Sequence, residues 1–386
     1  MYPVDPLAQT VVVKPSGNRR AATLALAVAG ALVALMLGLL TLLFIGVATG
    51  PVAFLIGFVF ATLPVPIYLA LVLWVDRYES EPLWALATTF LWGAMVAVFI
   101  AFVINTISGG IVAAILGKDA GNFFSAVISA PIVEEGAKAL VLFGIYFWKH
   151  DEFDGVVDGI VYASMVGLGF AMTENIQYYG QAALEGGIGG SMVLFILRGA
   201  MAPFSHPLFT SMTGIGLGLA SQSNKRSIKT IMPALGLVCA MGLHSLWNIT
   251  AALSQQIPLL FFLAYFFLMV PIFTGVLVAI FFALRREGRI VREHLLCDFQ
   301  RGLLHQQEYE CLCSIRGRIG ASLAALTKGG PRVWRARMRY NRVASDLAFH
   351  RSRISRGILP GDVAAAQREA AYLQVLRELR AQLGPY

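Results

Sequence analysis

The chain has 386 residues, of which 57% are hydrophobic and only 13% are charged, and its mean hydropathy is +0.70. A soluble domain carries about 25% charged residues, so the composition excludes an ordinary soluble protein. The four cysteines do not form a disulfide framework, because one lies in an apolar run and the others lie in a basic tail predicted to be cytoplasmic. They are Cys239, Cys297, Cys311 and Cys313.

Apolar runs follow one another along the chain, and each is long enough to cross a bilayer as a helix, which takes about 20 residues. In chain order they are residues 21–49, 52–75, 83–107, 122–148, 156–180, 191–219, 231–253 and 258–284. Gly50-Pro51 predicts a tight turn, and the glycine-rich residues 186–190 predict an external loop. The first run is too long for a signal peptide, so we expect a retained helix. The sequence predicts an all-α polytopic membrane protein with about eight transmembrane helices.

The placement of lysine and arginine predicts the orientation of these spans. If the N-terminus is inside, one side collects the arginine-rich tail together with Lys14, Arg19, Arg20, Arg77, Lys149, Lys225, Arg226 and Lys229. The opposite side then collects only Lys118. We therefore expect both termini to be cytoplasmic.

Three parts are expected: a cytoplasmic segment at residues 1–20, a membrane domain at 21–284 and a basic cytoplasmic helical tail at 285–386. The tail carries 18 Arg and one Lys against nine Asp and Glu, a net charge of about +10. Helical spacing puts Tyr340, Val343 and Leu347 on one face and Val363, Ala366, Leu373, Leu376 and Leu379 on another, with breaks at Gly329-Gly330-Pro331 and Pro360-Gly361. The tail either contacts anionic lipid headgroups or forms a small soluble appendage. No nucleic acid partner is expected, because no binding motif accompanies the arginines.

Polar and ionisable residues at membrane depth are concentrated in the fourth to seventh spans. They are Glu134, Glu135 and Lys138; Glu174 and Asn175; Arg198 and His206; and His244 and Asn248. Such residues are costly in a bilayer and usually functional. At 1.5 Å per residue Glu134, Glu174, His206 and His244 fall at similar depths, toward the outer side of the bilayer, so the sequence predicts one shared polar pocket. Pro131 is expected to loosen the helix beside this pocket, and Pro203 and Pro207 to bend the helix around the histidine.

Three chemistries would use this set of residues. Carboxylates and imidazoles together can hold zinc and activate a water molecule. Without a metal, a glutamate can itself deprotonate water while His and Asn donate to the oxyanion. Alternatively, the residues could relay protons or bind a cation in a transporter. Taken singly, a buried His is more often structural than catalytic, so the hypothesis rests on the joint occurrence.

The motifs resemble those of the PrsW family of intramembrane proteases, distant relatives of the CAAX prenyl endopeptidases. The resemblance covers the core at residues 76–248. It rests on Glu134-Glu135-Gly-Ala-Lys138, Phe170-xxx-Glu174-Asn175, His206 and His244-xxx-Asn248, supported by Asp76-Arg77-Tyr-Glu79-Ser-Glu81-Pro82 and Phe153-Asp154-Gly-Val-Val-Asp158-Gly. It implies an endopeptidase in a bacterial plasma membrane that cuts a membrane-anchored protein, such as an anti-sigma-factor-like regulator, near the outer face. The alternative function is a proton- or cation-coupled transporter.

We assign roles to these residues as expectations. Glu134 is the general base, with Glu135 as its alternative, and Lys138 neutralises the pair. Glu135, Glu174, His206 and His244 either bind Zn²⁺ or, in a metal-free glutamate mechanism, position the water. Asn248 is the oxyanion donor, and Arg198 pairs with a glutamate. The acidic motifs around Asp76, Glu81, Asp154 and Asp158 are expected to be structural or gating, with the last two as helix caps.

Overall fold

The structure is a computed structural model that describes residues 17–76, 78, 81–149 and 153–383. Every regular element within these ranges is helical, which confirms the all-α prediction. The α-helices are α1 (Gly17–Thr49), α2 (Pro51–Thr62), α3 (Val65–Val75), α4 (Leu83–Leu91), α5 (Val98–Leu116), α6 (Lys118–Phe124), α7 (Ala130–Trp148), α8 (Val156–Phe195), α9 (Ser205–Ser221), α10 (Arg226–Ser254), α11 (Leu259–Ala264), α12 (Val270–Gln300), α13 (Gln306–Leu312), α14 (Ile315–Ser355) and α15 (Val363–Leu383). Four π-helical segments join some of them: η1 (Trp92–Ala97), η2 (Ser125–Ser129), η3 (Ile196–Met201) and η4 (Tyr265–Met269).

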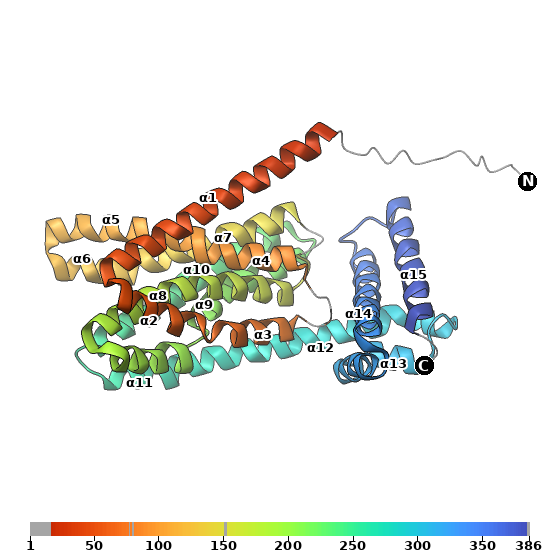
Figure 1. Cartoon of the computed structure of the whole chain (residues 1–386). Helices are drawn as coiled ribbons and strands as arrows, with labels where there is room; N and C mark the ends of the chain where they lie inside the picture. Colours follow the sequence, from red (N-terminus) through yellow and green to blue (C-terminus); the bar gives the residue numbers. More distant parts are fainter. Residues whose placement is uncertain (1–16, 77, 79–80, 150–152, 384–386) are drawn as a thin grey trace, which may run out of the picture.

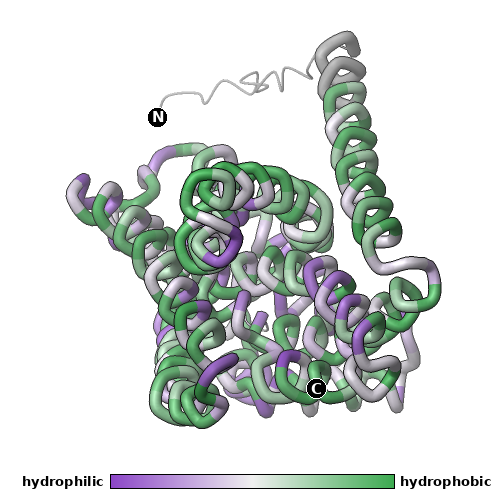
Figure 2. Tube along the Cα trace, turned by 90° about the vertical axis from the view of Figure 1, so that its left-hand side faces the viewer, coloured by the Kyte–Doolittle hydropathy of each residue, from purple (hydrophilic) through white to green (hydrophobic). Residues whose placement is uncertain are grey.

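Six helical segments of the described chain are long and apolar enough to cross a membrane. They are Ala25–Thr49, Pro51–Val75, Leu83–Leu116, Val156–Ser221, Arg226–Ser254 and Leu259–Gln300. Their outer faces expose large apolar side chains such as Leu63 (69%) and Phe267 (78%), which suit lipid rather than water. Viewed along the bundle, most of the trace is hydrophobic (Figure 2). The protein is a multi-pass membrane protein, as predicted.

Two features bear on the number of passes. The 66-residue segment turns back where Gly186 and Gly187 leave the helical conformation, the latter with φ +60°, and Ser191 Oγ then donates to the Tyr179 carbonyl at 2.8 Å. α7 carries Glu134, Glu135 and Lys138, so its composition alone does not mark it as a span, yet it lies lengthwise in the bundle (Figure 1). Both features agree with about eight helical passes. The number of spans and their orientation stay predictions.

α8 is the central helix of the bundle, buried without interruption from Val157 to Ala171. Its glycines allow neighbouring backbones to approach closely, as is common between membrane helices. A Cβ atom on Gly214 of α9 would lie 2.0 Å from the Gly159 carbonyl oxygen, and one on Gly169 would lie 2.0 Å from that of Phe90 in α4. The packing of α4 and α9 against α8 therefore requires glycine, which has no side chain, at positions 169 and 214.

The tail is a helical unit joined to the bundle by α12, which continues past the predicted boundary at residue 284 without a break (Figure 1). α14 bends at Gly330 (φ +74°) and Pro331, and Pro360-Gly361 lies between α14 and α15, as predicted. The predicted apolar face of Tyr340, Val343 and Leu347 is buried in a core shared with the membrane domain. The second predicted face is buried only in part, because Leu376 and Leu379 pack inside while Val363 is exposed.

The acidic motifs stabilise the loops at the tail end of the bundle. Asp158 caps α8, because its Oδ2 accepts from the backbone N–H groups of Asp154 (2.9 Å) and Gly155 (2.7 Å). Asp76 likewise accepts from the Glu81 N–H at 2.8 Å, and Glu81 in turn accepts from the Tyr162 hydroxyl. The expected capping role is confirmed for Asp158. Arg77 and Glu79 of the first motif lie outside the described residues.

Enlarging Gly214 is expected to destabilise the bundle. Gly214→Ala forces α8 and α9 apart, and overpacking of this kind costs about 1–3 kcal/mol. We expect a lower midpoint of thermal unfolding in detergent. Gly242→Ala is the matched control, since a Cβ there meets nothing within 4 Å. Equal midpoints for the two variants would contradict the close approach of these helices.

The stability of the tail-side loops is expected to fall as the pH rises. Burial raises the pKa of Asp76 to about 7, and burial together with repulsion from Asp158 raises the pKa of Asp154 to about 7 despite attraction to Arg353. Both values lie above those of the unfolded chain. The contribution of the two carboxyl groups to the free energy of unfolding is therefore complete below about pH 4, and it is lost as the pH rises through 7. Limited proteolysis should cut these loops faster at pH 8 than at pH 6, and Asp154→Asn should weaken that dependence.

Candidate active site

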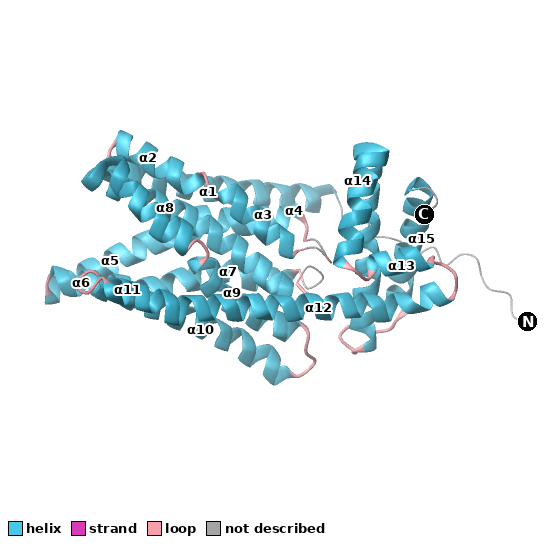
Figure 3. Cartoon of the chain, turned by 90° about the horizontal axis from the view of Figure 1, so that it is seen from below, coloured by secondary structure: helices cyan, strands magenta, loops and turns pink. Residues whose placement is uncertain are grey.

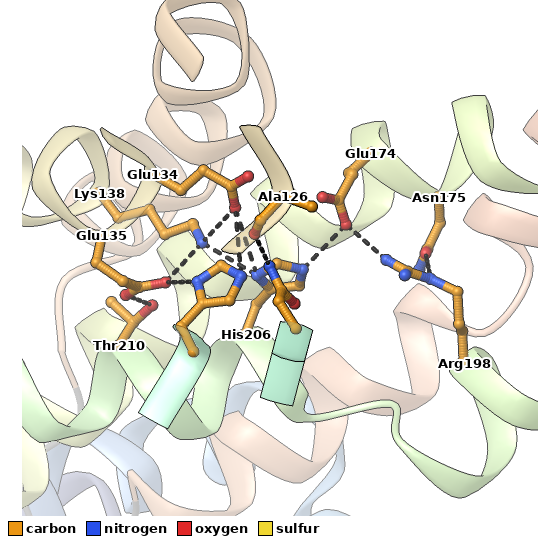
Figure 4. Close-up of polar contacts among 11 residues, drawn as sticks. Ala126, Glu134, Glu135, Lys138, Glu174, Asn175, Arg198, His206 and Thr210 are labelled. Carbon is orange, nitrogen blue, oxygen red and sulfur yellow. Dashed lines mark hydrogen bonds and ion pairs between the residues drawn. The ribbon is translucent and has the colours of Figure 1, made fainter. Parts of the chain in front are cut away.

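Four helices bring titratable side chains together inside the bundle (Figure 4). α7 contributes Glu134, Glu135 and Lys138, α8 contributes Glu174, α9 contributes His206 and α10 contributes His244. Glu135 and Lys138 are fully buried, and the two histidines are nearly so. The structure thus places six of the seven predicted catalytic residues in one cluster. The seventh, Asn248, lies one helical turn beyond His244.

Backbone that departs from the regular α-helix flanks the cluster. Neighbouring side chains donate hydrogen bonds to the carbonyl groups that it leaves free. The π-helical segment η2 precedes Pro131, and its carbonyl groups at Val127 and Ala126 accept from Ser245 Oγ (2.7 Å) and Asn248 Nδ2 (2.8 Å). The expected loosening before Pro131 is therefore present. Asn248 thus already donates an amide N–H to the Ala126 carbonyl, just before α7. Its expected donation to an oxyanion stays a prediction.

The turn before His206 is held in the same way. After η3 the chain leaves the helix at Ala202 and re-enters at Ser205, so that His206 lies in the first turn of α9. The Met201 carbonyl accepts from the Tyr265 hydroxyl at 3.0 Å, and the Gly199 carbonyl accepts from the Tyr68 hydroxyl. Freed carbonyls inside a membrane need such partners. The predicted bend around the histidine is thereby fixed in one conformation.

Lys138 lies at the centre of the cluster. Its Nζ is 2.8 Å from Glu135 Oε1, 3.5 Å from Glu134 Oε2 and 3.0 Å from His206 Nδ1, and it sits 3.9 Å from the centroid of the Phe170 ring. One ammonium therefore faces two carboxylates and one imidazole. It balances part of the negative charge that the adjacent glutamates bring into the bilayer.

Each imidazole has one carboxylate behind it and presents its other nitrogen to Glu134. His244 Nδ1 is 3.1 Å from Glu135 Oε1, and His206 Nε2 is 3.0 Å from Glu174 Oε2. The opposite nitrogens, His244 Nε2 and His206 Nδ1, lie 3.9 and 4.0 Å from Glu134 Oε2. An ionised carboxylate only accepts, so we assign the protons to His244 Nδ1 and His206 Nε2. The two lone pairs then face the same carboxylate.

Glu134, His206 and His244 offer donor atoms that lie within 4.8 Å of one another. Two imidazoles and a carboxylate form a common catalytic zinc set, and orienting carboxylates behind the histidines are typical of such sites. The donors therefore fit zinc, provided that Lys138 gives up His206 Nδ1.

The geometry favours a different ligand set from the expected one. Glu135 is saturated by Lys138, His244 and the Thr210 hydroxyl (2.8 Å), so it lies behind the site, and Glu134 takes its place. Glu174 is likewise held by Arg198 and His206. The role of Thr210 was missed, since its only sequence signal is its position one turn after His206.

Arg198 forms the accessible edge of the cluster. Its Nη2 is 2.6 Å from Glu174 Oε2, its Nε donates to Asn175 Oδ1 at 2.9 Å, and its guanidinium covers the Tyr178 ring. The predicted pairing of Arg198 with a glutamate is confirmed. Side-chain exposure rises from 7% at Glu134 to 16% at Glu174 and 28% at Arg198. The cluster is thus most open on the Arg198 side.

Comparisons with known proteins bear on this site. The family model described as "PrsW family intramembrane metalloprotease" matches residues 81–276, just over half of the chain, and this range contains the whole cluster. Proteins named "Protease PrsW" are similar in Geobacillus kaustophilus (34% identical over 39% of this chain and 60% of that one), Oceanobacillus iheyensis (31%, over 44% and 71%) and Bacillus subtilis (31%, over 50% and 83%). The first match thus spans less than two thirds of the relative.

No solved structure matches the chain. The family model nevertheless covers the spans that carry every residue of the cluster, and the curated relatives that match are named as proteases. The chain therefore belongs to the PrsW family of intramembrane metalloproteases, and its enzyme class is that of a membrane-embedded peptidase.

Proposed function

We propose that this protein hydrolyses a peptide bond of a membrane-anchored protein with water activated by Glu134. The observation that carries the proposal is the position of this carboxylate. Glu134 Oε2 faces both imidazole lone pairs, and its shortest polar contact is 3.5 Å, whereas Glu135 and Glu174 are held by contacts of 3.1 Å or less. Of the three, Glu134 is the carboxylate whose oxygen atoms are least engaged by neighbouring side chains.

The residues divide the chemistry between them. Glu134 takes a proton from the water as its oxygen attacks the peptide carbonyl carbon, and the same proton then goes to the leaving nitrogen as the C–N bond breaks. Lys138, 3.5 Å away, offsets the negative charge that develops beside it. His206 and His244 keep the water in place with orientations fixed by Glu174 and Glu135.

Zn²⁺ is part of the proposal, because the donor set fits it and the family is described as metalloproteases. His206 Nδ1, His244 Nε2 and Glu134 Oε2 would hold the ion. When bound, zinc supplies a Lewis acid that makes water acidic near neutral pH. In its absence Lys138 remains on His206 Nδ1, and the same glutamate acts alone.

We place the cut near the outer side of a bacterial plasma membrane, with both termini cytoplasmic, and an anti-sigma-factor-like regulator is the kind of substrate that suits this position. Residues 21–284 would form the protease domain and residues 285–386 the tail. The tail's positive charge favours contact with anionic headgroups.

Glu134→Gln is expected to abolish cleavage. The amide cannot accept the proton, and loss of a general base costs about 10²–10⁴-fold in rate. Membrane-anchored fragments from cells with either form, compared by proteomics, identify the substrate, which is then cleaved in proteoliposomes. Glu185→Gln is the matched control at an exposed carboxylate on the Gly186 turn. Cleavage by Glu134→Gln at the wild-type rate would contradict the assignment.

The purified protein is expected to contain about one zinc per chain, and His206→Ala and His244→Ala are expected to lose most of it. Metal content is measured by mass spectrometry after extensive dialysis. His294→Ala, on α12 away from the cluster, should keep its zinc. Metal-free protein that still cleaves after chelation would overturn the zinc proposal and leave the Glu134 mechanism intact.

A further inference from the structure

The first part of α14 and the residues after its bend carry an unusual charge pattern. Residues 315–339 contain seven basic residues and no acidic one. Arg318 and Arg337 are buried. The exposed five are Arg316, Lys328, Arg332, Arg335 and Arg339. None of the described contacts pairs these five with a carboxylate, so the surface of this segment is strongly positive.

A stripe of large apolar side chains lies among these cations. It comprises Ile319 (52% exposed), Leu323 (58%), Leu326 (40%), Trp334 (37%) and Met338 (47%). Spacings of three and four residues put the members within each half of the bent helix on one face. This stripe is separate from Tyr340, Val343 and Leu347, which the tail buries in its core. An apolar face rimmed by cations is typical of helices that lie in a membrane interface.

The position of the segment suits that interpretation. The two halves of α14 pack together where Asn341 Nδ2 donates to Ser322 Oγ (3.3 Å) and Arg318 Nη1 donates to the Asn341 carbonyl (3.4 Å). Arg318 Nη1 also donates to the Tyr78 carbonyl at 3.2 Å, three residues after the span Pro51–Val75 ends. The base of the segment is therefore fixed at the membrane edge.

Its direction also fits. Figure 3 shows α14 lying crosswise to the long axis of α12, at the end of the bundle. That end also carries the exposed tryptophans Trp74, Trp84 and Trp148, close to the termini of α3, α4 and α7. Tryptophans gather at the level of the lipid headgroups. A helix that lies crosswise at this level runs along the bilayer surface.

We propose that residues 315–339 form an interfacial anchor that docks on the anionic lipid surface of the adjacent leaflet, with the stripe among the acyl chains and the five cations at the headgroups. This deepens the proposed lipid contact of the tail and is independent of the peptidase chemistry. Charge selects the occupant, because a second copy of the chain in a symmetric contact would bring the same cations face to face.

Trp334 reports the docking directly. The full-length protein is placed in nanodiscs, one chain each, made of brominated phosphatidylcholine with or without brominated phosphatidylglycerol. The emission of Trp334 is the difference between the wild type and Trp334→Phe. We expect it to fall at least about twofold in the discs that contain phosphatidylglycerol relative to neutral discs, because bromine quenches only tryptophans among the acyl chains.

Charge variants separate docking from general attraction. Arg332→Glu with Arg335→Glu should restore the emission, whereas Arg301→Glu with Arg377→Glu, the same charge change at exposed sites outside the stripe, should leave it quenched. Equal quenching in neutral and anionic discs would overturn the proposal, as would quenching that appears only in a second preparation with two chains in each disc. Glu134→Gln should be quenched like the wild type, so failure of the peptidase proposal remains distinguishable.

Discussion

Lys138 is the charge on which the arrangement of the site depends. A lone ammonium inside a bilayer is very costly, and so are two adjacent carboxylates, but the three together with an imidazole largely compensate one another. The compensation holds only if α7 and α9 meet at this depth, because Nζ reaches His206 across the helices as well as Glu134 and Glu135 along its own. α10 is drawn to the same point, since His244 bonds to the carboxylate that Lys138 holds. Removing the lysine would leave buried negative charge without its ammonium partner and would remove one of the contacts that join α7 to α9.

Next to this point of convergence the helices depart from regular α-helical geometry and form π-helical segments. η2 lies before the glutamates and η3 lies before His206, and side chains from α10, α3 and η4 satisfy the carbonyls that these segments release. π-helical segments often mark functional sites, because they turn side chains to directions that a regular helix does not provide. The glycine contacts of α8 serve the opposite purpose. They bring α9 close enough for His206 to reach Glu174.

Sequence patterns predicted much of this and failed at specific points. Hydropathy predicted a multi-pass helical membrane protein, and a common depth predicted that Glu134, Glu174, His206 and His244 would meet. The sequence could not distinguish the roles of Glu134 and Glu135, because both lie within reach of Lys138 on one helix. The difference comes from Thr210 and His244 on other helices, which saturate Glu135. In the tail, helical periodicity predicted apolar faces, but it could not distinguish a face buried in protein from an exposed one. It therefore predicted the buried face of α14 and not the exposed stripe on the same helix.

The uninterrupted course of α12 has a mechanical consequence. A single helix of 31 residues carries the tail at one end, and near its other end it packs against α9 through Val276, together with Met269 just before its start, against Leu208 and Phe209. The Phe209 ring in turn stacks on His244. Because α12 is continuous, a tilt of the tail would shift Val276 and, through it, the Phe209 ring that stacks on His244. The orientation of the tail would therefore bear on the position of His244 in the candidate active site.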